Sequence, residues 1–208
     1  MTKRNISRYA IISASCYVSF QIIANILSSK ITILPFFHLA VDGGTIIYPL
    51  TFTLRDFVHK TVGKKESRMA VILAAAINVA MVGLFWIIGK MPSDPSWGYQ
   101  EAYEAILIPV WRITAGSIIA QVISELIDTE VFSALYRLLG DMKAVVASNT
   151  VALIFDSLIF SAIAFLGALP LDVVFEIIIA NIAVKFFVSI LSSPFIKLIP
   201  HMADESKI

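Results

Sequence analysis

The sequence predicts an all-α integral membrane protein with six transmembrane helices and with both the N-terminus and the C-terminus in the cytoplasm. Three observations predict this fold class. The composition is 58% hydrophobic and 15% charged, whereas soluble domains carry about 25% charged residues. The mean hydropathy is +0.85, and the Lys and Arg residues gather on one side of the predicted spans. At about 20 residues a span, residues 1–208 form a single transmembrane domain without a separate soluble domain.

The six predicted spans cover about residues 9–29, 45–62, 69–89, 106–127, 146–169 and 171–191. The first follows a basic start like that of a secretion signal, but no small-residue cleavage site closes it, so we expect a retained helix. The second carries Pro49 within its first two turns, where a helix tolerates proline. The fourth has no clear end, because helical patterning continues past Glu125 to about Tyr136. It is either one long tilted helix or a span with an amphipathic extension.

Two connections between the spans have distinct compositions. Residues 31–44 begin with β-branched apolar residues and end with Gly43 and Gly44, which predicts an extended or re-entrant connection. Residues 90–104 contain Pro92, Pro95 and Trp97. They predict an ordered turn region with aromatic residues at the membrane interface.

The orientation follows from the placement of Lys and Arg, which accumulate in cytoplasmic loops. With the N-terminus inside, 11 of the 16 Lys and Arg residues lie on the cytoplasmic side and one, Lys90, lies outside. The remaining four, Lys30, Arg55, Arg112 and Lys185, lie at or within the spans. An even number of spans returns the C-terminus to the cytoplasm.

Two apolar segments near the end of the chain each carry an ionisable residue in their middle. Asp156 lies in the fifth predicted span and Lys185 in the sixth. A charge at bilayer depth costs at least about 2.5–3.5 kcal/mol and usually faces a bundle interior or a water-filled cavity. The two residues have opposite signs, so they could also be each other's partner. A membrane protein built around a polar cavity, with transport as its function, is the resulting prediction.

Further polar residues align with these charges at helical spacing. Asn149 and Asp156 are seven residues apart and share a face of the fifth span, and Asn181 and Lys185 share a face of the sixth. Gln121, Glu125 and Asp128 form a similar stripe on the fourth span. The structural alternative is an ion pair that holds the bundle together and has no other role.

Several chemistries are excluded or unsupported. A net charge of +1 argues against nucleic-acid binding driven by charge. His38, His59 and His201 share no helical face, so no metal site is predicted. The single cysteine, Cys16, permits no internal disulfide. The chain has no P-loop, no Gly-x-Gly-x-x-Gly and no Gly-x-Ser-x-Gly motif, so no cofactor is predicted.

An ordered set of segments carries a recognisable pattern. The set is Asn25-Ile-Leu-Ser-Ser-Lys30, Gly44-Thr-Ile-Ile-Tyr-Pro-Leu-Thr-Phe-Thr-Leu-Arg-Asp56, Gly63, Arg112, Ser117, Leu126-Ile-Asp-Thr-Glu-Val-Phe132, Ser148, Asp156-Ser-Leu-Ile-Phe160, Glu176 and Lys185. Over about residues 15–195 it resembles the signature of the queuosine precursor transporter family, also classed with vitamin uptake transporters. The resemblance implies a multi-pass inner-membrane protein that imports 7-deazaguanines such as preQ0, preQ1 or queuine for tRNA modification.

The resemblance points to a set of candidate substrate-binding positions, and chemistry suggests their roles. Asp156 or Asp56 would accept hydrogen bonds from the ring N–H and the exocyclic amine of a 7-deazaguanine. Asn25 or Asn149 would bind the ring carbonyl, and Phe52 or Phe160 would stack on the ring. Lys185 would keep the carboxylate of an empty site ionised or orient it. The complete candidate set is Asn25, Phe52, Asp56, Arg112, Asn149, Asp156 and Lys185.

Other functions remain as alternatives. The chain could be the substrate-binding subunit of an energy-coupling vitamin importer, which would require an ATPase complex. A different class is an intramembrane enzyme acting on lipid, but no constellation of His, Ser or Cys supports it, so we expect no enzyme. Small residues of the third span, Gly83 and Ala74–Ala76, could seat a second copy in a homodimer. Proton coupling and facilitated diffusion both stay open as energy sources.

Overall fold

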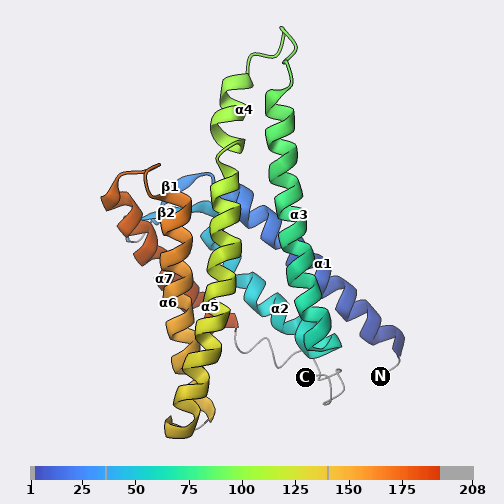
Figure 1. Cartoon of the computed structure of the whole chain (residues 1–208), viewed down its shortest axis with the longest axis vertical. Coiled ribbons are helices and arrows are strands. Elements are labelled where there is room, and N and C mark those ends of the chain that lie inside the picture. The colour runs from blue at the N-terminus through green and yellow to red at the C-terminus, as the bar shows by residue number, and fades with distance from the viewer. Residues whose placement is uncertain (1–2, 36, 140, 193–208) are drawn as a thin grey trace.

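The computed structural model describes residues 3–35, 37–139 and 141–192, which are mostly helical. Its elements are α1 (Lys3–Leu27), β1 (Ile31–Ile33), β2 (Ala40–Asp42), the 3-10 helix η1 (Gly43–Ile46), α2 (Tyr48–Val62), α3 (Lys64–Lys90), α4 (Gln100–Leu107), α5 (Val110–Leu139), α6 (Asp141–Phe165) and α7 (Leu171–Ser192). Helices α3, α5 and α6 run along the long axis, and α1, α2 and α7 cross it obliquely (Figure 1).

Four helical segments within the described residues are long and apolar enough to cross a membrane. They are Tyr9–Leu27, Lys65–Lys90, Gln100–Asp128 and Ala147–Phe165, and they correspond to the first, third, fourth and fifth predicted spans. The second predicted span corresponds to α2, whose 15 residues extend about 22 Å, less than the ~30 Å hydrocarbon core. The sixth corresponds to α7, which carries Asp172, Glu176 and Lys185.

The fourth predicted span is broken near its start. Residues 100–107 form α4, although residues 100–104 were expected in a turn region. Pro109 separates α4 from α5 because proline has no backbone N–H to continue a helix. Beyond this break, α5 continues through Glu125 to Leu139 as one helix of 30 residues, about 45 Å long. The helical pattern past Glu125 therefore continues the same helix, beyond the length that a span needs.

The connection between α3 and α4 is ordered, as expected. Trp97 packs edge-on against the rings of Tyr99 and Tyr103, each 6.3 Å away between ring centroids. The backbone N–H and the hydroxyl of Ser96 donate to Asp94 Oδ1 at 2.8 and 2.5 Å. These two hydrogen bonds lower the pKa of Asp94 below its usual range.

The segment after α1 is extended, as predicted, and forms an antiparallel hairpin. Its register pairs Ile31 with Asp42 and Ile33 with Ala40. All three residues of β2 are buried, and the Ala40 N–H, on the open edge of the hairpin, donates to Glu176 Oε2 of α7 at 2.9 Å. A buried backbone N–H without a partner would be costly, so Glu176 fixes the hairpin against α7. The chain is therefore helical with one small two-stranded sheet.

Two apolar clusters hold the helices together. One joins α5, α6 and α7 around the hairpin, and its buried members include Ile113, Phe160 and Ile177. The other joins α1, α2 and α3 through Tyr17, Val58, Ala70 and Ala74. Ala74 is therefore inside the fold, which corrects its expected place in a dimer contact.

Candidate functional site

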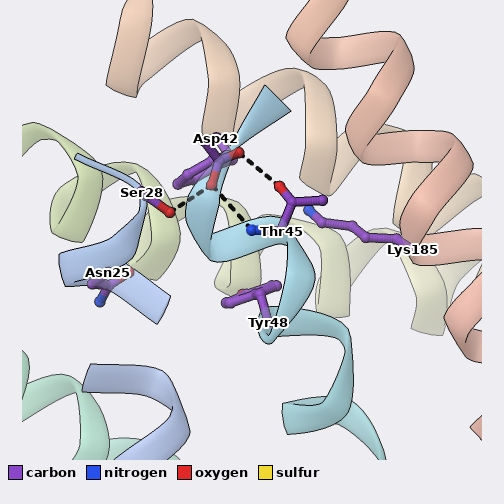
Figure 2. Close-up of a pocket in the computed structure, with 7 residues that line it drawn as sticks. Asn25, Ser28, Asp42, Thr45, Tyr48 and Lys185 are labelled. Atoms are coloured by element: carbon purple, nitrogen blue, oxygen red, sulfur yellow. Dashed lines mark hydrogen bonds between the residues drawn. The ribbon is translucent and has the colours of Figure 1, made fainter. Parts of the chain in front are cut away.

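A small buried cavity lies where the turn from β2 into η1, the C-terminal end of α1 and helices α2, α6 and α7 meet. Its lining residues are Asn25, Ser28, Asp42, Thr45, Tyr48, Phe160 and Lys185. Lys185 extends into it from α7 and Ser28 from the turn directly after α1, with Asp42 and Thr45 between them (Figure 2). Residues far apart in the sequence thus form one polar site inside an apolar helical protein.

Asp42 is the carboxylate at the turn between β2 and η1 and is 1% exposed. The Ser28 hydroxyl donates to its Oδ1 at 2.6 Å, and the Thr45 N–H donates to the same oxygen at 3.2 Å. The Thr45 hydroxyl donates to Oδ2 at 2.7 Å (Figure 2). Asp42 therefore caps η1 and ties it to α1. These three hydrogen bonds offset part of the cost of burying a carboxylate.

The turn can approach α1 this closely because Gly43 and Gly44 have no side chains. A Cβ atom on Gly44 would lie 2.4 Å from the Ala24 carbonyl oxygen, and one on Gly43 would lie 2.6 Å from the Leu27 carbonyl oxygen. Both distances are below any that real Cβ atoms adopt. The position of Asp42 against Ser28 thus depends on the two glycines that follow it.

Asn181 extends the hydrogen-bond network into α7 and α6. Its carboxamide contacts the Thr45 hydroxyl, and its Nδ2 donates to Ser161 Oγ of α6 at 3.4 Å. Both Asn181 and Ser161 are fully buried. One network therefore connects the C-terminal end of α1, the turn from β2 into η1, α7 and α6.

Asp156 and Lys185 form a direct ion pair beside this network. Lys185 Nζ donates to Asp156 Oδ2 at 2.6 Å, and the two side chains are only 3–4% exposed. The same ammonium lies 5.1 Å from the centroid of the Tyr48 ring and 5.7 Å from that of Phe160. A carboxylate with two aromatic faces is an arrangement that binds cations. Asp156 Oδ1 has no hydrogen-bond partner within the part of the chain that the structure describes.

The cavity is closed in this structure. Its volume is about 10 Å³, which is near the minimum that holds one water molecule. A bicyclic heterocycle could enter only after Lys185 or the surrounding helices move. Membrane transporters commonly bind their substrates at such a central site and open it alternately to each side.

The structure brings three of the seven sequence-predicted site residues together and separates three others. Asn25 lines the cavity with Lys185, and Asp156 lies behind Lys185 as its ion-pair partner. Phe52 packs edge-on against the Tyr48 ring at 5.5 Å and does not itself line the cavity. Asn149, two turns from Asp156 on α6, is exposed. The Asp56 side chain lies outside the described part of the structure.

Arg112 serves the fold rather than the cavity. Its Nε donates to the Ile163 carbonyl at 3.3 Å and its Nη2 to the Leu166 carbonyl at 2.6 Å. These carbonyls belong to the last turn of α6 and the residue after it, where a helix has unpaired acceptors and a partial negative charge. Arg112 therefore caps α6 from α5.

Sequence reasoning missed Asp42 as a site residue. The signal was an Asp directly before Gly-Gly-Thr, a combination in which the Asp side chain caps the following turn. That pattern predicts a turn, but it does not predict that α1 and α7 meet there. Thr45 and Ser28 were missed for the same reason.

Apolar outer faces around a buried polar site with intramembrane charges are typical of membrane transporters. Residues 42–199 match the model of the family described as "Putative vitamin uptake transporter". The chain belongs to this family, which confirms the resemblance seen in the sequence. It is also 31% identical, over 175 residues, to the "Probable queuosine precursor transporter" of Bacillus subtilis (strain 168), an alignment that covers 79% of this chain and 76% of that protein. No solved structure gives a significant match.

Proposed function

We propose that this protein imports queuosine precursors, the 7-deazaguanine bases used in tRNA modification, across the cell inner membrane. The observation that carries the proposal is the buried site in which the Asp156–Lys185 pair, Asp42 and two aromatic rings meet. Its setting in a chain of this family, with a relative named as a queuosine precursor transporter, supports the choice of substrate.

The substrate would take the place that the Lys185 ammonium now occupies between Tyr48 and Phe160. The bicyclic ring would stack on these aromatic faces. Asp156 has one oxygen without a partner among the described residues. Its carboxylate would accept hydrogen bonds from the ring N–H and from the exocyclic amine, which lie side by side. Asn25 lines the same cavity and would donate to the ring carbonyl. Lys185 would return to Asp156 after the substrate leaves.

The proposed topology has six crossings, with both termini in the cytoplasm. Helices α1, α3, α6 and α7 and the α4–α5 segment would each make one crossing, and α2 would make another together with the hairpin and η1. The distribution of Lys and Arg supports this orientation. A homodimer would use the exposed face of α3, where Ala76 and Gly83 lie at the surface.

The proposal is tested in cells that can neither synthesise queuosine nor import its precursors. The chain is expressed, each 7-deazaguanine is supplied at low concentration, and queuosine is measured in the purified tRNA by mass spectrometry. We expect queuosine to be restored with at least one precursor. No restoration with any precursor, despite confirmed membrane insertion, would contradict the proposed substrate class.

The charges of the site predict a preference between precursors. Among the described residues, Asp42, Asp156 and Lys185 leave one net negative charge at the cavity. A 7-deazaguanine with a protonated aminomethyl group would neutralise this charge, whereas the nitrile form is neutral. A unit charge about 8 Å away at an effective dielectric constant of about 20 contributes about 2 kcal/mol. Since about 1.4 kcal/mol corresponds to a factor of ten, we expect the cationic precursor to be imported at about thirtyfold lower concentration than the neutral one.

Asp42→Asn should remove most of this preference, because it keeps the shape of the side chain and deletes its charge. The matched control is Ser28→Ala, which removes a hydrogen bond to Asp42 without changing the charge. Ser28→Ala should lower the import of both precursors by a similar factor. Competition between the two precursors in the tRNA assay gives the ratio. An unchanged ratio in Asp42→Asn would show that Asp42 does not determine the charge preference.

A further inference from the structure

The buried face of α1 is polar over four successive turns. Ser13, Tyr17, Gln21 and Asn25 follow one another at intervals of four residues, and each is at most 5% exposed. We call these four residues the polar face of α1. The large exposed side chains of the membrane part of this helix include Ile11, Ile12, Ile23 and Leu27. Helix α1 is thus polar inside and mainly apolar outside, the reverse of a helix in a soluble protein.

Neighbouring helices place polar side chains opposite this face. Asn25 Nδ2 donates to Asn78 Oδ1 of α3 at 2.8 Å. Gln21 Nε2 and Gln121 Nε2 of α5 donate to the Tyr17 hydroxyl at 3.3 and 3.5 Å. The polar face therefore begins at the cavity, which Asn25 lines, and continues along α1 toward the N-terminus.

An ion pair lies near the N-terminal half of the polar face. Arg55 Nη1 of α2 and Glu125 Oε1 of α5 are 2.5 Å apart, and their side chains are 29% and 50% exposed. Glu125 lies one turn beyond Gln121 on α5, and Gln121 donates to the Tyr17 hydroxyl, so the pair lies close to Tyr17. The polar face thus leads from a small, buried cavity to a pair of charges that is partly exposed.

We infer that the polar face of α1 is the inner half of the substrate path, from the cavity to the cytoplasmic side, and that the Arg55–Glu125 pair closes its mouth. The ligand of this path is the same polar heterocycle that the cavity binds, so the inference rests on the proposed function and topology. In this structure, Tyr17, Gln21 and Asn25 form hydrogen bonds with each other or with side chains of neighbouring helices. In the open form, their donors and acceptors would pass the substrate along α1.

Hydrogen bonds between membrane helices can also serve association alone, typically at about 0.6 kcal/mol each. One such bond, between Asn25 and Asn78, would be enough to join α1 to α3. Association does not account for a polar face that continues through Gln21, Tyr17 and Ser13, with hydrogen bonds as long as 3.5 Å. A path accounts for it, because every turn along a path must interact with a polar substrate or with water.

Water accessibility of single cysteines distinguishes the two roles. Cys16 is the single cysteine of the chain, so a Cys16→Ser background accepts Ser13→Cys or Gln21→Cys on the polar face. The matched control is Ser19→Cys, which lies between them in depth on the exposed side of α1. Ser13→Cys and Ser19→Cys are the same small change, so neither should impair folding. Each variant is treated with a charged, membrane-impermeant methanethiosulfonate in inside-out vesicles.

We expect the cysteines at positions 13 and 21 to react at least tenfold faster than the one at position 19, and Glu125→Gln to increase the rate at position 21. Labelling needs no substrate, so it tests the path independently of the proposed function. Protection by an added 7-deazaguanine would support both. Labelling without protection by any precursor would support the path along α1 but contradict the proposed substrate class. Rates at 13 and 21 as slow as at 19, with and without Glu125→Gln, would overturn the path.

Discussion

Neutralising either member of the Asp156–Lys185 pair is expected to abolish import. The pair is almost completely buried and joined at 2.6 Å, so Asp156→Asn or Lys185→Met leaves one charge without its partner. Such a loss costs about 3–5 kcal/mol in a buried site. We expect a reduced amount of folded protein in the membrane. The amount of queuosine in the tRNA should be at least tenfold lower than with the unmodified chain.

The double variant Asp156→Asn with Lys185→Met separates stability from substrate binding. It contains no unpaired charge, and it avoids the cost of burying two charged groups. We expect the amount of inserted protein and its melting temperature to recover while import stays absent, because the base would lose its carboxylate partner. Recovery of import together with stability would mean that the pair only holds α6 and α7 together.

A methyl group at position 44 is expected to disable the site from the backbone side. In Gly44→Ala, the new Cβ would lie 2.1 Å from Ser28 Oγ and 2.4 Å from the Ala24 carbonyl oxygen. Ser28 could rotate away, but the carbonyl belongs to α1, so η1 must move away from the helix. Overpacking of this kind costs about 1–3 kcal/mol, and the displacement would break the hydrogen bond from Ser28 to Asp42.

The matched control for Gly44→Ala is Gly98→Ala in the exposed connection between α3 and α4, where a Cβ atom would meet nothing within 4 Å. Thermal unfolding in detergent and the tRNA assay measure both effects. We expect a lower melting temperature and at least a tenfold loss of import for Gly44→Ala, and neither for Gly98→Ala. Unchanged import in Gly44→Ala would show that the close approach of η1 to α1 is dispensable.

Hydropathy made the helical membrane class of the chain predictable. The candidate spans at 9–27, 65–90, 100–128 and 147–165 lie at predicted positions, because the length of an apolar run is a local property of the chain. The family was predictable too, since it depends on an ordered set of residues. Asp156 and Lys185 stood out because a charge within an apolar run is conspicuous without knowledge of its neighbours.

Sequence spacing could not decide which polar residues converge. It places Asn149 and Asp156 on one face of a helix, yet Asn149 is exposed and Asp156 is buried. Arg112 belonged to the predicted site, yet it caps α6. Spacing orders residues around a single helix axis, whereas the rotation of each helix against its neighbours is set by side-chain packing.

By itself, the sequence determined the membrane class of this protein, its apolar helices, its family and the two buried charges of opposite sign. The tertiary structure alone decided that Lys185 meets Asp156, and that Asp42 enters the same site through a glycine turn packed on α1. It also decided that α1 turns its polar face inward toward Asn78 and Gln121. The physical reason is range: burial of apolar residues is specified within each segment, but a polar site is formed by contacts between segments.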